Sequence, residues 1–156
     1  MPVRRGEPAD AAFVVEMARL ASVIEDRPLP PADDPDLVQG LPPAPAPGTS
    51  LLALDDDGRP VGAAWWHFRE PPLLVAPDGA PVPEIVVAVV PADRGRGTGR
   101  RLLDALAAHT ARQGHDRMVL NVHIRNPAAR LYSRVGFTVA GKGRGPLGVA
   151  MVRELC

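Results

Sequence analysis

The sequence predicts one α/β (α+β) domain built on a single mixed, mostly antiparallel sheet of six to seven strands flanked by helices. Apolar runs with strand-like and helix-like spacing alternate along the chain in the order β-α-loop-β-β-β-α-β-α-β-β. An Asp57-Gly58 turn between two apolar runs indicates an antiparallel hairpin. A glycine-rich loop and an amphipathic helix separate the apolar runs 84–90 and 118–122, which indicates a parallel pair.

The first half of the chain supplies a short strand, a helix and the hairpin. Residues 3–5 form the candidate strand, and Pro8 suits the first turn of a helix that we expect to reach about Ser22. Apolar residues recur there at helical spacing, namely Phe13, Met17, Leu20 and Ile24. The hairpin is expected over 50–54 and 61–68, and the acidic run at its turn fits a solvated turn better than a cation site.

Residues 25–48 break the regular pattern. Eight prolines in this segment forbid a long helix or a central strand, although a short helical turn around Asp36–Gln39 fits the sequence. A loop of this length in one compact domain is usually functional or mobile, and the alternative is a proline-stiffened spacer. Residues 69–83 form a second connection rich in proline and glycine.

The second half of the chain begins with the strand 84–90. This strand has almost no polar position, so we expect it at the centre of the sheet and covered on both faces. A helix follows from about 97 to 113, with an apolar face made of Leu102, Leu103, Leu106 and Thr110. Asn126-Pro127 starts a short helix that ends at Gly136. The remaining predicted strands are 118–122, 137–140 and 147–152.

Composition limits the classes of protein that this chain can be. Its 156 residues suit one domain spanning 1–156, and no apolar run approaches the length of a membrane span. The N-terminal residues show no apolar signal core, so we expect a cytoplasmic protein that does not bind membranes. The single cysteine, Cys156, excludes an intramolecular disulfide, and the histidines lack the spacing of metal ligands, so no metal site is predicted.

A net charge of zero hides a division along the chain. Residues 1–90 carry 14 acidic residues and 6 arginines, a net charge of −8. Residues 91–156 carry 4 acidic residues, 11 arginines and Lys142, a net charge of +8. The second half therefore offers an anion site, and the first half offers either a cation site or a plain solvated surface.

The loop 91–100 has the features of a site for a phosphorylated ligand. The first backbone amides of the helix that follows have no intrahelical partner and can donate to an anion. Three glycines open the backbone and three arginines add forked donors, namely Gly95, Gly97 and Gly99, and Arg94, Arg96 and Arg100. The loop is not a P-loop, and an arginine stands where the dinucleotide fingerprint requires its last glycine. The alternative is a basic loop whose glycines serve only tight packing.

Two stretches resemble motifs of the GNAT superfamily of N-acetyltransferases. The segment from Arg94 to Gly99 is similar to the acetyl-CoA loop of that family, Arg/Gln-x-x-Gly-x-Gly/Ala. The segment from Asn126 to Phe137 is similar to a second family motif, Asn…Ala…Leu-Tyr-x-x-x-Gly-Phe. The two motifs stand in the family's order, with the expected helix and strand between them, and the resemblance covers residues 84–140 closely.

The resemblance implies a GNAT-like acyl-CoA N-acyltransferase fold and acetyl-CoA as co-substrate, without a metal. In the family the sheet opens in a V between the fourth and fifth strands, and the thioester lies in the gap. The residues expected to contact the co-substrate are Val89, Val90, Arg94, Gly95, Arg96, Gly97, Thr98, Gly99, Arg100, Asn126 and Ala129. The amide of Val89 is the expected donor to the oxyanion. Which residue among 126–129 touches the co-substrate is left open.

The implied reaction is transfer of an acetyl group to a primary amine by direct attack in a ternary complex. Tyr132 matches the family's general acid, and its alternative role is packing alone. Glu84, at the start of the central strand, is the candidate base, acting directly or through water, and its alternative is a carboxylate that faces solvent. His67 is a second candidate base, with a packed core histidine as its alternative.

The acceptor and the partners follow from weaker signals. Acidic residues in and near the proline-rich loop favour a cationic small-molecule or peptide amine, namely Glu25, Asp26, Asp33, Asp34 and Asp36. The alternative function is a non-catalytic acetyl-CoA- or CoA-binding regulatory module. Nucleic-acid binding is not expected, because the basic half lacks interleaved aromatic residues. A homodimer is compatible with the sequence.

Overall fold

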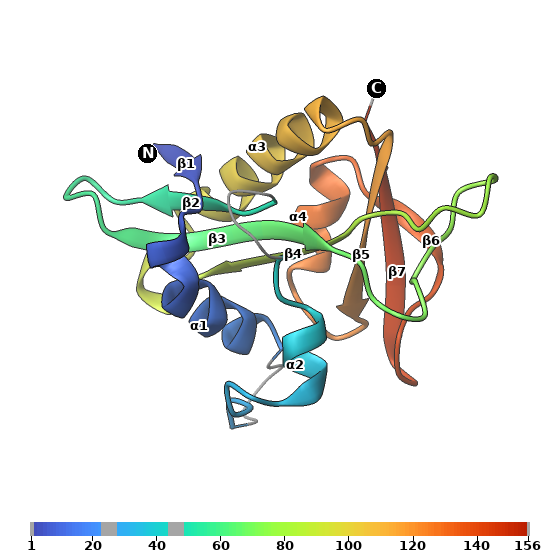
Figure 1. Cartoon of the computed structure of the whole chain (residues 1–156), viewed down its shortest axis with the longest axis horizontal. Helices are drawn as coiled ribbons and strands as arrows, with labels where there is room; N and C mark the ends of the chain where they lie inside the picture. The colour runs from blue at the N-terminus through green and yellow to red at the C-terminus, as the bar shows by residue number, and fades with distance from the viewer. Residues whose placement is uncertain (1, 23–27, 44–48, 156) are drawn as a thin grey trace.

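The computed structural model describes residues 2–22, 28–43 and 49–155, and its strands form one sheet in the order β1-β2-β3-β4-β5-β7-β6 (Figure 1). The strands are β1 (Val3–Arg5), β2 (Leu51–Leu54), β3 (Pro60–His67), β4 (Glu84–Val89), β5 (Arg117–His123), β6 (Thr138–Lys142) and β7 (Gly148–Glu154). Neighbouring strands are antiparallel except β4 and β5, which are parallel. The predicted mixed, mostly antiparallel sheet is therefore confirmed.

Helices cover both faces of this sheet (Figure 1). They are α1 (Ala11–Ala21), α2 (Pro35–Gln39), α3 (Thr98–Arg112) and α4 (Ala129–Arg134), with short 3-10 turns η1 (Pro8–Asp10) and η2 (Pro91–Asp93). Helices α1 and α2 pack on one face, and α3 and α4 pack on the other. None of these helices is both long enough and apolar enough to cross a membrane.

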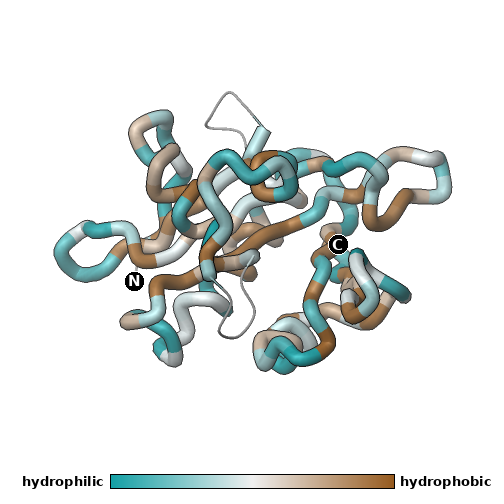
Figure 2. The backbone as a smooth tube through the Cα atoms, turned by 90° about the horizontal axis from the view of Figure 1, so that it is seen from below, coloured by the Kyte–Doolittle hydropathy of each residue, from teal (hydrophilic) through white to brown (hydrophobic). Residues whose placement is uncertain are grey.

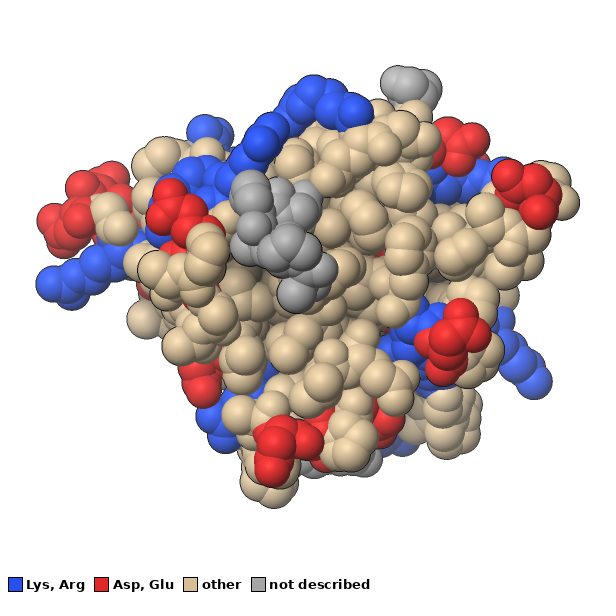
Figure 3. Space-filling view, viewed as in Figure 1, with Lys and Arg blue, Asp and Glu red and all other residues tan. Residues whose placement is uncertain are grey.

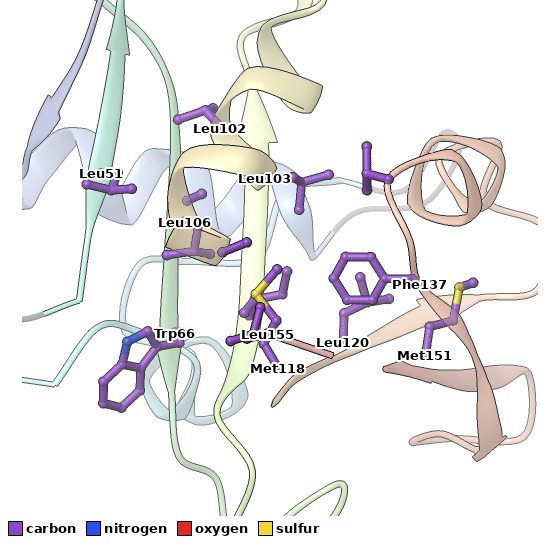
Figure 4. Close-up of a cluster of buried hydrophobic side chains, with 14 of the residues drawn as sticks. Leu51, Trp66, Leu102, Leu103, Leu106, Met118, Leu120, Phe137, Met151 and Leu155 are labelled. Atoms are coloured by element: carbon purple, nitrogen blue, oxygen red, sulfur yellow. The ribbon is translucent and has the colours of Figure 1, made fainter. Parts of the chain in front are cut away.

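The larger apolar core lies between the sheet and α3. Leu102, Leu103 and Leu106 have no exposed surface, and Thr110 is also fully buried, so the predicted apolar face of α3 is confirmed. Figure 4 shows these leucines beside side chains from the strands, including Trp66 of β3. Along the backbone, hydrophobic residues concentrate in the strands and hydrophilic residues in the outer loops (Figure 2).

The helix α1 begins later than its sequence predicts. Residues 8–10 form the turn η1, because the Asp10 carboxylate accepts the Glu7 amide at 2.8 Å and pairs with Arg4 at 2.7 Å. The buried face of α1 is Val14, Met17 and Ala18. Of the four residues predicted to face the core, only Met17 is fully buried; Phe13 and Leu20 pack partly buried, and Ile24 lies outside the described residues.

The sheet opens between β4 and β5. The strand β4 pairs with β3 along its whole length, from Glu84 opposite His67 to Val89 opposite Gly62. It pairs with β5 at one position, Glu84 opposite Val119. The two parallel strands therefore separate toward their carboxyl ends, and the predicted V-shaped opening between the fourth and fifth strands is confirmed.

A short helical turn anchors part of the proline-rich segment beside this opening. The Asp34 carboxylate accepts the amides of Asp36 and Leu37 at 3.0 and 3.3 Å, which caps α2 and confirms the helical turn predicted there. The indole of Trp65, which is fully buried in β3, donates to the Gly40 carbonyl at 2.7 Å. The cap stabilises α2 itself, and the hydrogen bond from Trp65 fixes the end of this segment against the sheet.

Candidate functional site

A cavity of about 800 Å³ lies where β4 and β5 separate. Its walls include β4 from Glu84 to Val89, residues of β5, and the start of α4, and its far end reaches α1 and α2. A second cavity of about 370 Å³ at the start of α3 shares four lining residues with the first, namely Val89, Arg94, Gly99 and Leu131. The two cavities therefore adjoin at the end of β4.

The edge of β4 offers backbone groups to the gap. The Val90 amide donates to the Val61 carbonyl at 2.9 Å, so it faces β3 and not the gap. Because successive residues of a strand present their amides to opposite edges, Val87 and Val89 face β5, where β4 has no paired neighbour beyond Glu84. Val89 is thus placed as expected, whereas Val90 is not. Val87 is not among the residues predicted to contact the co-substrate, although the same alternation along the strand places its amide on the same edge as that of Val89.

The loop before α3 has the backbone shape of an anion site. Gly95 and Gly97 have φ values of +78° and +80°, a region that other residues adopt at a cost. The first intrahelical bond after this turn runs from the Arg101 amide to the Gly97 carbonyl, so the amides of Gly99 and Arg100 precede the regular pattern. A Cβ on Gly99 would lie 3.3 Å from the Leu131 side chain, which keeps this position small.

Three arginines converge on the smaller cavity, but they are not the three that the sequence predicts. Arg94 and Arg100 line it, and Arg94 is fixed there because its Nε donates to the Val89 carbonyl at 3.2 Å. Arg96 points outward instead, with its side chain 67% exposed and 3.7 Å from the Asp93 carboxylate. The third lining arginine is Arg134 of α4, which has no signal in the local sequence.

The second motif places its first residues at the cavity wall. Asn126, Pro127 and Ala128 line the larger cavity, whereas Ala129 packs against the apolar core. The Asn126 side chain accepts the Ala128 amide at 2.9 Å, and this turn precedes α4, so the helix begins at Ala129 and not at Pro127. The described contacts therefore put Ala128, and not Ala129, at the cavity.

Tyr132 lies on α4 and lines the larger cavity. Its ring contacts that of Phe137, with ring centroids 5.9 Å apart. Burial raises the pKa of Tyr132 to about 12, so the phenol keeps its proton at neutral pH. A protonated phenol facing a cavity can donate a proton or a hydrogen bond, and its packing on Phe137 does not exclude that.

Glu84 is buried at the other end of β4, and it does not face solvent. Its side chain points to the face that carries α1 and α2, since the alternate residues Val86 and Ala88 pack there. Burial raises the pKa of Glu84, while Arg144 and Arg69 oppose that rise. A carboxylate with a raised pKa accepts and releases protons closer to neutral pH than an ordinary one.

His67 lies beside Glu84 on the neighbouring strand, with Nε2 4.0 Å from a carboxylate oxygen of Glu84. It is 2% exposed, and burial, followed by the charges of Arg69 and Arg144, lowers its pKa to about 4. The imidazole is therefore neutral at pH 7 but a weak base. Of the two candidate bases, Glu84 has the pKa better suited to proton removal.

Two arginines at this end of the cavity were missed by sequence reasoning. Arg144 lies 3.0 Å from Glu84, and its backbone amide donates to the Asn121 side chain at 2.8 Å. Arg69 donates to the Asp36 carbonyl at 2.6 Å. Both line the larger cavity. Arg69 occurs in the connection after β3 and Arg144 in a glycine-rich turn, and neither position carries a local motif.

The acidic residues expected at the acceptor mouth are only partly gathered there. Asp34 and Asp36 line the cavity, Asp33 is exposed, and Glu25 and Asp26 lie outside the described residues. On the face shown in Figure 3, acidic and basic side chains both occur around the outline, and neither sign covers this face alone. Within the described ranges, no three His, Cys, Asp or Glu side chains gather as metal ligands would.

Comparison with known proteins identifies the family. Residues 16–137 match the model of the Acetyltransferase (GNAT) family. The chain belongs to the GNAT acetyltransferase family. A solved GCN5-related N-acetyltransferase from Kribbella flavida is 26% identical, with a TM-score of 0.70 over 99% of this chain and 97% of that one. The putative acetyltransferase yncA from Salmonella typhimurium, solved with its cofactor acetyl-CoA, is 23% identical and has the same fold, with a TM-score of 0.70 over 100% of this chain and 94% of that one.

Curated relatives of this GNAT chain match over shorter stretches. A 5-NmdU N-acetyltransferase of Pseudomonas phage PaMx11 is 40% identical over 69 residues, which are 44% of this chain and 47% of the relative. A mycothiol acetyltransferase of Clavibacter sepedonicus is 37% identical over 92 residues, which are 58% of this chain and 27% of the relative. The chain thus matches less than half the length of either curated relative.

Proposed function

We propose that this GNAT protein transfers the acetyl group of acetyl-CoA to a primary amine by direct attack in a ternary complex. One observation carries the proposal: the anion-binding turn before α3, the free edge of β4, Tyr132 and Glu84 all line two adjoining cavities. The turn suits a phosphorylated donor, and the two side chains suit proton transfer.

The donor end fits acetyl-CoA. The pyrophosphate would accept hydrogen bonds from the amides of Gly99 and Arg100 at the positive end of α3. The guanidinium groups of Arg94 and Arg134 would complete its coordination. The pantetheine arm carries amides that can pair with the free edge of β4 as an added strand would. The yncA structure, which contains acetyl-CoA, supports this donor for a protein of the same fold.

The acceptor end supplies the proton transfers. An ammonium group must lose a proton before its nitrogen attacks, and Glu84 accepts it, directly or through water. The lone pair then forms the C–N bond, the C–S bond breaks, and the nitrogen loses a second proton. This proton restores the phenol of Tyr132 after that residue has protonated the sulfur, and Glu84 releases its own proton to solvent. Tyr132 protonates the departing sulfur, so the products are an N-acetyl amine and the CoA thiol. An amide on the β4 edge stabilises the oxyanion formed between these steps.

An amine-panel assay tests the proposal. The protein is incubated with acetyl-CoA and primary amines, and both the CoA thiol and the acetylated amine are quantified. We expect turnover of at least one amine, and we expect Tyr132→Phe to lower kcat by about 10²- to 10⁴-fold, the usual contribution of a general acid. Ser133→Ala is the matched control, because Ser133 is the exposed neighbour on the same helix.

Calorimetric binding separates enzyme from sensor in the same experiment. Tyr132→Phe should bind acetyl-CoA as the unmodified protein does, since the anion-binding turn is untouched. If the protein binds acetyl-CoA but acetylates no amine, the proposed activity is wrong and a CoA-binding regulatory module takes its place.

A further inference from the structure

We infer that the amine acceptor also carries a carboxylate close to its amino group, as an amino acid does, and that Arg144 and Arg69 bind this carboxylate. The inference rests on the proposed function and adds the chemical class of the acceptor. It begins from the acceptor end of the cavity, where the guanidinium groups of Arg69 and Arg144 lie with the buried carboxylate of Glu84, beside the acidic residues Asp34 and Asp36 at the start of α2.

The buried carboxylate of Glu84 has two guanidinium groups near it, those of Arg144 and Arg69. Glu84 pairs with Arg144, and Arg69 donates to the backbone carbonyl of Asp36, whose own side chain is exposed. The Asp34 carboxylate is turned toward the amides of α2, which it caps. The pKa of the neighbouring His67 is lowered first by burial and then by the charges of both arginines. A partly buried guanidinium group is costly unless an anion joins it.

The same arginines hold buried donors without partners. Within the described ranges, Nη1 of Arg144 and Nε of Arg69 are buried and make no hydrogen bond. The other terminal nitrogen of Arg144, Nη2, is already used, since it donates to the Pro71 carbonyl at 2.8 Å and lies 3.0 Å from Glu84. Buried polar groups in folded proteins are nearly always hydrogen-bonded, and a carboxylate supplies two acceptors for such forked donors.

Arg144 is held in place without a ligand. Its backbone amide donates to the Asn121 side chain, and the Gly143 amide donates to the Gly148 carbonyl at 2.9 Å. A Cβ on Gly143 would collide with the same Asn121 oxygen, so this turn closes tightly on β5. A fixed guanidinium loses little freedom on binding an anion, which favours recognition over a loose surface contact.

The spacing of the groups sets the kind of acceptor. Nη2 of Arg144 and a carboxylate oxygen of Glu84 are 3.0 Å apart. A molecule whose carboxylate meets this arginine, and whose amine reaches the glutamate directly or through water, therefore carries the two groups on nearby atoms. An α- or β-amino acid meets this condition, whereas a polyamine brings a second positive charge to the arginines. The inference thus specifies a zwitterion, where the sequence favours a cationic small-molecule or peptide amine.

Matched substrates test the inference directly. Amino acids are compared as acetyl acceptors with their own carboxamides, which keep the amine and side chain but lose the negative charge. We expect kcat/KM for the best amino acid to exceed that of its carboxamide by about 10-fold or more, the effect of a charge-assisted hydrogen bond. Arg144→Gln should bring that ratio close to one, and Arg69→Gln should lower it.

Arg59→Gln is the control, because it removes one positive charge from the exposed hairpin turn and should leave the ratio unchanged. The ratio compares two substrates on one protein. If part of a variant is unfolded, the measured kcat/KM falls by the same factor for both substrates, and the ratio does not change. Equal use of acids and carboxamides by the unmodified protein would overturn this inference and leave the proposed function standing. A ratio that stays above about 10 in Arg144→Gln would also overturn it. Absence of turnover with every amine would overturn the proposed function itself.

Discussion

Acidification should destabilise this protein through His67. The imidazole is buried at the end of β3, opposite Glu84 of β4, and the charged groups near it are Glu84, Arg69 and Arg144. Burial and the two arginines lower its pKa from 6.5 to about 4. Because the folded state binds the proton less tightly than the unfolded state, stability is fully present above pH 6.5 and is lost as pH falls toward 4.

The size of this loss follows from the two pKa values. With a pKa of 6.5 unfolded and about 4 folded, the free energy of unfolding falls by about 2 kcal/mol between neutral pH and about pH 5. Glu84 acts in the opposite direction, because burial raises its pKa, so its protonation favours the folded state as pH falls. That contribution remains when His67 is replaced.

Urea unfolding of the unmodified protein and of His67→Gln, each at about pH 7.5 and about pH 5, isolates the effect. Glutamine is neutral at both values, so the variant should lose about 2 kcal/mol less than the unmodified protein on acidification. The fixed cost of the substitution cancels, because each protein is compared with itself. If both proteins lost the same stability, the assignment of the buried, neutral imidazole would be wrong.

Two further predictions use pairs of matched positions. Gly97→Ala and Gly58→Ala both place a side chain at a φ near +80° in open space, so each should cost about 1 kcal/mol of stability, but only the first should raise the KM for acetyl-CoA. If Gly97→Ala and Gly58→Ala had the same KM for acetyl-CoA, that result would argue against an anion site at Gly97. Trp65→Phe should cost about 1–3 kcal/mol in urea unfolding and raise the amine KM, because the buried Gly40 carbonyl loses its donor. Trp66→Phe, on the opposite face of β3, should leave the amine KM unchanged, and a matching rise there would contradict the reasoning.

Local chemistry explains which parts of the fold the sequence predicts well. The α3 boundary is marked by glycines and an apolar stripe, and both signals act within a few residues. The start of α4 is predicted two residues too early, at Pro127 and not at Ala129, because Asn126 can cap a helix or close a turn with the same side-chain oxygen. In the structure that oxygen closes a turn at Ala128, and the helix begins at the next residue.

Long-range contacts explain what the sequence does not show. Arg96 lies inside the glycine motif, yet it turns toward Asp93, whereas Arg134 reaches the smaller cavity from a different helix. Arg144 sits in a turn whose glycines and proline are typical of any solvated loop. Only the pairing of β5 with β7 carries that turn to Asn121 and Glu84, and pairing between distant strands leaves no periodic signal.

The length of β4 constrains how its two ends work together. Residues in a strand advance about 3.3 Å each, so Glu84 and Val89 are about 17 Å apart along the backbone, and Glu84 and Val87 about 10 Å. A glutamate side chain cannot span the first distance to deprotonate an amine that attacks a carbonyl held at Val89. If Glu84 is the base, the geometry favours Val87 as the oxyanion donor, since its amide also faces the gap, and it requires a water between the carboxylate and the amine. Val89, whose carbonyl accepts from Arg94, then holds the pantetheine arm closer to the pyrophosphate.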